Sequence, residues 1–424
     1  MNCRHCGAAL ALTMLDLGHA PPSNAFLLRK QLSGPEIWYP LRVLVCETCW
    51  LAQTQDTGVG DRLFGDDYAY FSAYSSSWLE HARIYVQAMV RRFALGPHSM
   101  VVEVAANDGY LLQYVQKAGI PCYGVEPTAG TALAARGRGL EIVTEFFGTS
   151  LAERLQGQGR TADLLVANNV LAHVPDINDF VAGFTHLLKP HGVATFEFPH
   201  LLRMVQECQF DTVYHEHFSY LSLTAVQQIL AAQGLVVFDV EQWPTHGGSL
   251  RVFAQRADAG VYAVQVAVAD MLAQEQHSGV RSPAFYRQFQ HETERIKHEL
   301  LIWLLACRRD RISVAAYGAA AKGNTLLNFA GVRPDLLPYV VDRNPAKQGK
   351  YMPGSRIPVV DEQQLRVHKP MRVLILPWNL QDEIVQQLAY IGQWGGQFVS
   401  AVPRLRLLTA VAGVPLTDSS GGDR

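Results

Sequence analysis

The densest run of ionisable side chains in this sequence is the string Tyr214-His215-Glu216-His217. Two histidines around a glutamate supply a base whose ordinary pKa lies near neutrality, and a carboxylate that can orient an imidazole or hold it protonated. The same His-x-His pair could hold a metal ion, but no third ligand of obvious spacing accompanies it. The string therefore predicts a general base more strongly than a catalytic metal site.

Two other polar segments are expected near this string. His173 follows the pair Asn168-Asn169 at the end of an apolar run, where a histidine can serve chemistry or can simply be a hydrogen-bonded polar group. Farther along the chain, His246 and Arg251 flank a Gly-Gly turn that would let a ligand approach the backbone. We therefore predict that His246 and Arg251 contact the substrate.

Four of the seven cysteines form two Cys-x-x-Cys pairs, Cys3 with Cys6 and Cys46 with Cys49. Two such turns supply the four tetrahedral sulfurs of a closed zinc site, which leaves no position for water or substrate. The apolar run 43–45 predicts a strand that leads into the second pair. Four unliganded cysteines, or disulfides, are the alternatives. The spacing favours a structural zinc ion in a ribbon with a long insertion.

These clusters need elements to carry them, and strands alternating with helices are predicted from residue 100 onward. Apolar runs at 101–104, 122–126, 163–167 and 193–198 read as strands, with helical periodicity between them. This alternation predicts a doubly wound parallel sheet whose ligand lies at the carboxyl ends of the strands. Glu126 ends the second run, so it is placed to accept hydrogen bonds from ribose hydroxyls.

The loop after the first of these strands reads Glu103-x-Ala105-x-Asn107-x-Gly109. It lacks the G-x-G-x-x-G pattern of dinucleotide-binding proteins. It is similar to the looser loop of S-adenosylmethionine (SAM) methyltransferases, in which an acid precedes a small residue and a glycine. A loop whose small residues only permit a tight turn is the alternative. The SAM interpretation assigns cofactor contacts to Glu103, Ala105, Asn107, Gly109, Glu126 and Asn168.

A second nucleotide-type pattern lies beyond residue 310. A strand at 314–317 leads into Gly318-x-Ala320-x-x-Gly323 and a helix, and Asp342 follows the next strand. Alanine in the middle position hinders the close approach of a pyrophosphate, so an NAD site stays open as an alternative without being favoured. The next loop carries three cations, which suit a phosphate ligand and a solvated surface equally: Arg343, Lys347 and Lys350.

Composition excludes several classes of protein. The 424 residues are 49% hydrophobic and 17% charged, which predicts a globular chain of two to four domains. Thirty-six Lys and Arg against 38 Asp and Glu give a net charge of -2, so non-specific nucleic-acid binding is disfavoured. No apolar run approaches the length of about 20 residues that crosses a bilayer, and no signal peptide is evident. We expect a soluble cytoplasmic protein that does not bind membranes.

Taken in order, the motifs resemble one family across nearly the whole chain, the SAM-dependent sugar-nucleotide C-3-methyltransferases of deoxysugar pathways. They are the paired cysteines, the Glu103 loop, Tyr-His-Glu-His-Phe-Ser-Tyr-Leu-Ser, His-Gly-Gly-Ser-Leu-Arg and Gly-Ala-Ala-Ala-Lys-Gly-Asn. The resemblance implies an α/β fold with an N-terminal zinc ribbon, a central doubly wound class I methyltransferase domain and a C-terminal Rossmann-like domain. The domains are expected at 1–66 (zinc-binding), 67–257 (SAM-binding methyltransferase), 258–311 (helical connection), 312–410 (Rossmann-like, sugar-nucleotide-binding) and 411–424 (flexible tail).

The chemistry that the resemblance implies is methylation at C-3 of an NDP-4-keto-6-deoxyhexose. A base removes the C-3 proton, the neighbouring ketone stabilises the enolate, and the carbon takes the methyl group of SAM. The resemblance assigns the base to His217 and places Tyr214, Glu216 and His173 around it. The oligomeric state is open, and a monomer is compatible with the sequence.

The resemblance also implies a tyrosine from the segment after the zinc module, and we prefer Tyr68 to Tyr70 and Tyr74. Sugar-nucleotide contacts are assigned to His246, Arg251, Lys322, Asn324, Asn344 and Lys347. Two alternative functions remain at this point. One is SAM-dependent methylation of oxygen or nitrogen on another metabolite, and the other is an NAD-binding sugar-nucleotide oxidoreductase.

Overall fold

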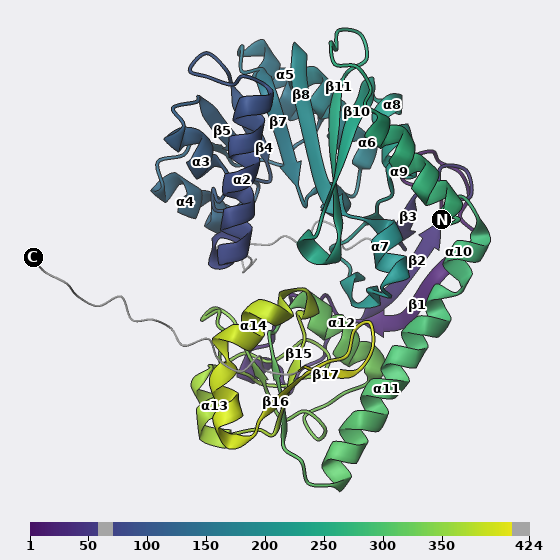
Figure 1. Cartoon of the computed structure of the whole chain (residues 1–424), viewed down its shortest axis with the longest axis vertical. Coiled ribbons are helices and arrows are strands. Elements are labelled where there is room, and N and C mark those ends of the chain that lie inside the picture. The colour runs from purple at the N-terminus through teal and green to yellow at the C-terminus, as the bar shows by residue number, and fades with distance from the viewer. Residues whose placement is uncertain (58–70, 409–424) are drawn as a thin grey trace, which may run out of the picture.

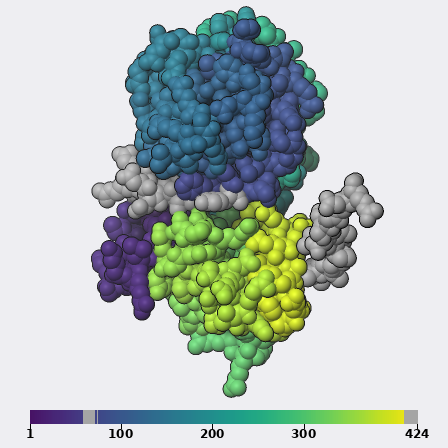
Figure 2. Space-filling model, turned by 90° about the vertical axis from the view of Figure 1, so that its left-hand side faces the viewer, coloured from purple at the N-terminus to yellow at the C-terminus, as the bar shows by residue number. Residues whose placement is uncertain are grey.

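Three β-sheets organise the chain in a computed structural model that describes residues 1–57 and 71–408. Figure 1 shows one sheet in the upper lobe, a second in the lower lobe and the short N-terminal sheet between them at the side. In the space-filling view of Figure 2, the N-terminal residues lie beside the lower lobe. No helix in this described part of the chain is both long and apolar enough to cross a membrane.

The N-terminal sheet joins segments that are distant in sequence. Its antiparallel order is β1 (Leu12–Ala20), β2 (Tyr39–Val45), β3 (Ala52–Thr54) and β9 (Ser219–Tyr220). β2 ends where the second cysteine pair begins, as the apolar run predicts. β9 comes directly after the Tyr-His-Glu-His string, so the string is tied to the N-terminal module by strand pairing.

The central sheet has the order β6-β5-β4-β7-β8-β11-β10, parallel except for β11. Its strands are β4 (Val101–Val104), β5 (Cys122–Val125), β6 (Ile142–Val143), β7 (Ala162–Asn168), β8 (Leu188–Pro199), β10 (Leu235–Trp243) and β11 (Ser249–Arg256). The strand order reverses between β4 and β7, and ligands of doubly wound sheets bind at such a switch point. The predicted doubly wound fold is confirmed.

Helices cover both faces of this sheet, so the side chains of its inner strands are buried and mostly apolar. The covering helices are α2 (Ser76–Arg92), α3 (Leu112–Lys117), α4 (Ala129–Gly137), α5 (Thr149–Gly157), α6 (Ile177–Leu187) and α8 (Leu223–Ala232). The short helix α7 (Leu201–Gln206) follows β8 and packs into the core of the N-terminal strands. Side-chain caps begin several of them: Ser75 accepts from the Trp78 amide at α2, and Ser222 from the Ala225 amide at α8. Short 3-10 turns are η1 (Arg29–Gln31), η2 (Ser72–Tyr74), η3 (Leu171–His173), η4 (Phe210–Thr212) and η5 (Thr245–Gly247).

The lower sheet has the order β14-β13-β12-β15-β16-β17, with only β17 antiparallel, which is Rossmann-like. Its strands are β12 (Val314–Tyr317), β13 (Val340–Val341), β14 (Val359–Val360), β15 (Arg372–Ile375), β16 (Gln397–Ser400) and β17 (Arg406–Leu408). Around it lie α12 (Ala321–Ala330), α13 (Gln363–His368), η6 (Trp378–Leu380), α14 (Gln381–Gln387) and η7 (Ala389–Trp394).

Three helices connect the two lobes: α9 (Val266–His277), α10 (Pro283–Arg287) and α11 (Phe289–Arg309). On α11 an apolar stripe packs inward through Phe289, Ile296 and Leu300. This stripe shares one apolar core with the N-terminal strands and the lower sheet. The N-terminal strands and the lower lobe therefore share one core, whereas the central sheet lies in other core clusters, and the predicted domain boundaries remain a proposal about folding units.

Candidate active site

The Tyr-His-Glu-His string lies between η4 and β9, next to the carboxyl edge of the central sheet. The Nδ1 of His217 lies 2.8 Å from the carbonyl oxygen of Thr212, and its Nε2 lies 2.7 Å from the hydroxyl of Tyr214. Because a carbonyl only accepts, Nδ1 carries the proton and donates. The neutral ring therefore presents an unprotonated Nε2, which accepts a hydrogen bond from the Tyr214 hydroxyl.

Two further histidines, His173 and His246, lie near this pair, and all three imidazoles are neutral at neutral pH. Burial, with smaller contributions from His173, Lys322 and His246, lowers the pKa of His217 well below its ordinary value. Burial likewise lowers the pKa values of His173 and His246 to about 4. The rings of His173 and His217 meet edge to face at 4.5 Å, and His173 Nδ1 lies 2.8 Å from the Glu216 carbonyl oxygen. An imidazole in this setting is available to accept a proton.

The carboxyl group of Glu216 is only 2% exposed, and burial raises its pKa. Its Oε1 accepts a hydrogen bond of 3.1 Å from Asn24 Nδ2, and its Oε2 is buried without a hydrogen-bond partner among the described residues. Asn24 belongs to the insertion between the two cysteine pairs. The N-terminal module thus reaches the same site as the central sheet.

The predicted cofactor loop follows β4 and has an unusual backbone. Ala105, Asn107 and Gly109 all have positive φ angles, of 58°, 49° and 77°. A left-handed alanine costs free energy, and such strain clusters where a backbone is shaped for a ligand. A side chain at Gly109 would lie 2.3 Å from Leu140 Cδ1, so this glycine permits close packing as well as the turn.

Two acidic side chains, Glu126 and Glu103, belong to the surroundings of this loop. The Glu126 carboxylate accepts hydrogen bonds of 2.9 Å from the amides of Asn107 and Thr128, which clasps the loops after β4 and β5 together. Glu103 is fully buried, and its desolvation raises its pKa well above the ordinary value. At the end of β7, Asn168 Oδ1 and both amide atoms of Asn169 are buried without a hydrogen-bond partner among the described residues. Unpaired buried amides beside a strained loop at the switch point fit a polar nucleoside ligand such as SAM.

The Gly-Gly turn holds His246 in a left-handed conformation with a φ of 54°. The His246 ring meets Trp78 edge to face at 5.0 Å, and its Nε2 is buried without a hydrogen-bond partner among the described residues. A side chain at Gly247 would lie 2.5 Å from Trp378, and one at Gly248 would lie 2.8 Å from Arg203. The glycines therefore permit close packing between elements rather than approach of a ligand, while His246 remains a candidate for substrate contact.

Arg251 is buried in an ion pair, whereas the sequence predicted that it contacts the substrate. Its guanidinium is 1% exposed, donates to Glu197 Oε2 at 2.7 Å and lies over the rings of Tyr85 and Trp243. Glu197 also accepts from Thr245, which precedes His246. Because Arg251 is buried and its charge is compensated by the Glu197 carboxylate, the structure does not present it to a ligand. We propose that the pair supports η5 through the contact between Glu197 and Thr245.

The lower lobe contributes Lys322 to this region. Its Nζ donates to Asn379 Oδ1 at 3.0 Å and lies 4.4 Å from the centre of the Trp378 ring, while Trp378 Nε1 donates to Asp211 Oδ2 at 2.8 Å. Burial lowers the pKa of Lys322 to about 8 and raises that of Asp211 to about 6. Lys322 is therefore the C-terminal candidate that the structure brings closest to the histidines, as its electrostatic effect on His217 indicates.

The other predicted C-terminal contacts are engaged within the protein. Asn324 is fully buried and donates to the Ser23 carbonyl oxygen, and the Asn344 side chain caps the amide of Ala346. Lys347 donates to the Ala319 carbonyl oxygen at 2.8 Å. Of the three, only Lys347 contacts the loop after β12, and any role of these residues in nucleotide binding stays a prediction.

The four predicted cysteine ligands converge. All four Sγ atoms lie within 4.8 Å of one another, and the two closest pairs are 3.5 Å apart. These separations exceed a disulfide bond of about 2.05 Å, and they approach the edge of about 3.8 Å expected of a tetrahedron with Zn–S bonds of about 2.3 Å. The donor set fits zinc, and Cys3, Cys6, Cys46 and Cys49 would hold it.

Tyr68 and Tyr70 lie outside the described residues, whereas Tyr74 falls on η2. The neighbouring backbone is tied to the cofactor loop, since the Ser72 amide donates to Asn107 Oδ1 and the Ala73 amide to Asp108 Oδ2. A tyrosine from this segment therefore stays a prediction.

Sequence reasoning missed the residues that hold the string in place. Asp211 and Thr212 lie just before Val213 and the string, and their position next to the ionisable cluster could have identified them. Thr54 and Trp378 carried no signal, because they are far away in sequence and belong to no recognised pattern. Arg4 lies inside the first Cys-x-x-Cys pair, but that pattern only indicates zinc ligands.

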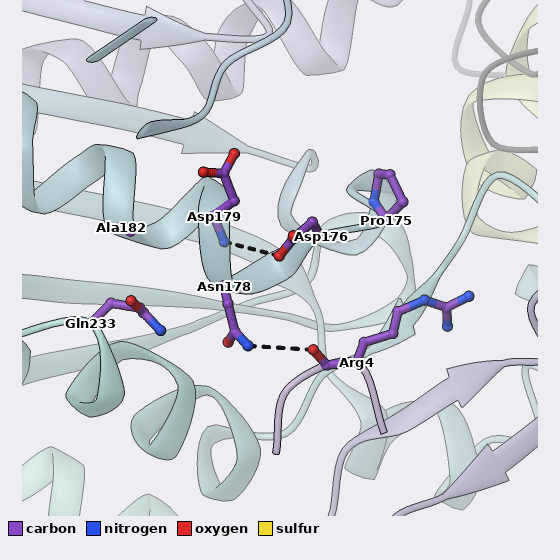
Figure 3. A pocket seen from close by; sticks show the side chains of 7 residues that line it. All are labelled: Arg4, Pro175, Asp176, Asn178, Asp179, Ala182 and Gln233. Atoms are coloured by element: carbon purple, nitrogen blue, oxygen red, sulfur yellow. Dashed lines mark hydrogen bonds between the residues drawn. The ribbon is translucent and has the colours of Figure 1, made fainter. Parts of the chain in front are cut away.

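A separate hollow of about 400 Å³ lies on the surface beside the zinc module (Figure 3). Its acids are engaged, because Asp176 caps α6 and Asp179 accepts from the Thr149 amide. It lies apart from the histidines, and its lining is Arg4, Pro175, Asp176, Asn178, Asp179, Ala182 and Gln233.

Comparisons with known proteins agree with this arrangement. Three family models match in order: a zinc binding domain at 3–64, a methyltransferase domain at 78–240 and a C-methyltransferase C-terminal domain at 244–403. The chain is 35% identical over 409 residues to the C-methyltransferase NovU of Streptomyces niveus, which covers 96% of this chain and 97% of that relative.

Solved methyltransferases are more distant. Magnesium protoporphyrin IX methyltransferase of Synechocystis PCC 6803, with bound SAH, is 16% identical with a TM-score of 0.34 and covers 42% of this chain and 83% of its own. A SAM-dependent methyltransferase of Clostridium acetobutylicum ATCC 824 is 10% identical with a TM-score of 0.34 and covers 42% of this chain and 92% of its own.

Proposed function

The chain belongs to the family of SAM-dependent C-methyltransferases, and from this premise we propose that it methylates C-3 of an NDP-4-keto-6-deoxyhexose. Its cofactors are SAM and zinc. The observation that carries the proposal is the 2.7 Å contact between the Tyr214 hydroxyl and the unprotonated Nε2 of His217. A 4-keto sugar has an acidic C–H bond next to a carbonyl oxygen, which matches a base next to a hydrogen-bond donor.

In this proposal the substrate separates the Tyr214–His217 pair. The Tyr214 hydroxyl turns from Nε2 to the C-4 oxygen, which frees the Nε2 lone pair to face C-3. Nε2 takes the C-3 proton, the C–H electron pair forms the C-3 to C-4 double bond, and the carbonyl electrons move to the oxygen. Tyr214 stabilises that enolate oxygen, and the Thr212 carbonyl keeps its hydrogen bond from the protonated ring. SAM, when bound, supplies an electrophilic methyl group for C-3.

The other site residues receive supporting roles in this proposal. Glu216 and His173 hold the string, His246 contacts the sugar, and Lys322 meets the negative charge of the diphosphate. Tyr68 stays the proposed additional tyrosine. For SAM, we propose contacts from the loop between Glu103 and Gly109, from Glu126 and from the end of β7.

The test is mass spectrometry of a panel of NDP-4-keto-6-deoxyhexoses incubated with the protein and trideuteromethyl-labelled SAM. We expect one sugar to gain the label on C-3, and NMR of the product locates it. In separate runs in D₂O, we expect the same sugar substrate to exchange its C-3 proton. A label on oxygen or nitrogen would point to the alternative methyltransferase chemistry. SAM binding with no labelled sugar would show that the substrate class is wrong.

A further inference from the structure

We infer that the first zinc-binding turn positions the catalytic histidine, and that Arg4 and Thr54 are positioning residues for His217. Arg4 lies between two zinc ligands in sequence, and Thr54 ends β3. The role of His217 as the base rests on the proposed function, whereas the structural link described below does not.

Arg4 connects the turn to the backbone of the catalytic string. Its Nη1 donates to the carbonyl oxygens of Thr54, at 2.8 Å, and Phe218, at 3.1 Å. Its guanidinium also lies 5.2 Å from the centre of the Phe218 ring. The Arg4 side chain therefore binds both the end of β3 and Phe218, the residue between His217 and β9.

Thr54 adds a direct contact with His217 itself. The Thr54 hydroxyl donates to the His217 carbonyl oxygen at 3.1 Å, and the Thr54 amide donates to the Phe218 carbonyl oxygen at 3.1 Å. The ladder continues as Gln53 pairs with Ser219 and Ala52 with Tyr220. The backbone of His217 is thus held by the N-terminal module through Thr54, and its ring is held by the Thr212 carbonyl oxygen.

Gln53 joins this ladder to the metal ligands. It is fully buried, donates from Nε2 to Cys3 Sγ at 3.3 Å and accepts from the Arg4 amide at 2.9 Å. A thiolate held by zinc accepts such a hydrogen bond and fixes the residue that donates it. A rigid path of hydrogen bonds therefore runs from the zinc ligand Cys3 through Gln53 and Arg4 to the His217–Phe218 backbone.

The second residue inside the turn makes a different contact, which supplies a matched control. His5 Nδ1 lies 2.8 Å from Asn178 Oδ1 on α6, and Asn178 Nδ2 donates to the His5 carbonyl oxygen at 2.8 Å. Figure 3 shows Asn178 directed at the backbone of Arg4 while the Arg4 side chain extends away from it. We expect loss of the His5 side chain to remove its contact with α6 and to leave the Arg4 contacts with Thr54 and Phe218 in place.

The first readout is backbone hydrogen exchange of the segment 212–222, measured by mass spectrometry on the zinc-loaded full chain. We expect Arg4→Met and Thr54→Val to speed its exchange about tenfold, because each removes a donor that closes the β3–β9 ladder. Thr54→Ser keeps the hydroxyl and should restore the wild-type rate. His5→Asn and the exposed Arg42→Met should leave this segment unchanged, and zinc content should stay at the wild-type level in every variant.

The second readout is turnover of the sugar that the wild type methylates. We expect Arg4→Met and Thr54→Val to lower kcat about 10- to 100-fold with unchanged SAM affinity, since a misplaced base loses reaction geometry rather than ligand contacts. Unchanged exchange in 212–222, or faster exchange with wild-type kcat, would overturn the inference. If no sugar is methylated by the wild type, the proposed function fails, and the exchange experiment still decides whether the turn holds the string.

Discussion

At the scale of single residues, one backbone acceptor sets the tautomer of the neutral His217 ring. The Thr212 carbonyl can only accept, so it fixes the proton on Nδ1 and leaves Nε2 for chemistry. Burial keeps that ring neutral, because it lowers the pKa of His217 well below the ordinary range.

Two variants separate the roles of this pair. His217→Asn should leave the SAM dissociation constant nearly unchanged and lower kcat at least about 100-fold, because only the base is lost. Tyr214→Phe should lower kcat by about 100- to 1000-fold through loss of a donor to the enolate oxygen. Calorimetric SAM titration and single-turnover kinetics measure both effects. Tyr123→Phe, whose hydroxyl donates to the distant Arg160 carbonyl, is the control. Near-wild-type turnover in His217→Asn would refute the assignment of the base.

At the scale of elements, a buried carboxylate fixes the helices that follow the string from Tyr214 to His217. Glu275 on α9 accepts from His200 Nε2 and the Leu223 amide, both at 2.7 Å, and from the amide and hydroxyl of Thr224. The carboxylate therefore caps α8 from a neighbouring helix. Although burial alone would raise it, the donors from His200 and Thr224 hold the pKa of Glu275 below its ordinary value.

Glu275→Gln should destabilise the fold by about 2–4 kcal/mol, because an amide group would face donors in a site without water. The depressed pKa means that the contribution of Glu275 is present above the ordinary glutamate pKa and is lost as the pH falls through the folded-state pKa. Urea unfolding at pH 7 and at pH 4 should therefore give a larger difference at pH 7. The exposed Glu153→Gln is the control. An equal difference at both pH values would contradict the charged state assigned to Glu275.

At the scale of the whole molecule, a hydrogen bond of 2.8 Å from Trp378 Nε1 to Asp211 Oδ2 joins the lower lobe to the segment before Tyr214, and Lys322 Nζ lies 4.4 Å from the centre of the Trp378 ring. Asp211 belongs to the segment that precedes the catalytic string, whereas Lys322 and Trp378 belong to the lower lobe. Burial lowers the pKa of Lys322 to about 8, and Asp211 acts in the opposite direction. Burial therefore brings the pKa of the cation proposed to meet the diphosphate near physiological pH, and the charge of Asp211 limits that shift.

This coupling predicts the alkaline limb of the pH profile. The charge of Lys322 is lost as the pH rises through about 8, so kcat/KM for the sugar nucleotide should fall there. Lys322→Arg should move the limb to higher pH because guanidinium stays protonated, and Asp211→Asn should move it to lower pH by removing the supporting charge. Lys350→Arg is the control. Superimposable profiles for all four proteins would exclude Lys322 as the titrating group.

Much of the molecule could be predicted from sequence, because its signals are local. Cysteines two residues apart share a turn, so the zinc ligands needed only their spacing. The runs at 101–104 and 314–317 alternate with helical periodicity, which determined two doubly wound sheets. The string from Tyr214 to His217 is contiguous, so it could be identified as a candidate general base before any fold was known.

Only the tertiary structure decided which partner each of these groups has. Arg251 was predicted to contact the substrate, but β8 supplies Glu197 and buries the pair. Arg4 had no role in the sequence, yet strand pairing brings β9 to the zinc module and places the Phe218 backbone within its reach. Burial and hydrogen-bond partners depend on segments that are far apart in the chain, whereas motifs and periodicity depend on neighbours. The sequence therefore determined the kinds of chemistry available, and the packing of three sheets decided which side chains carry it.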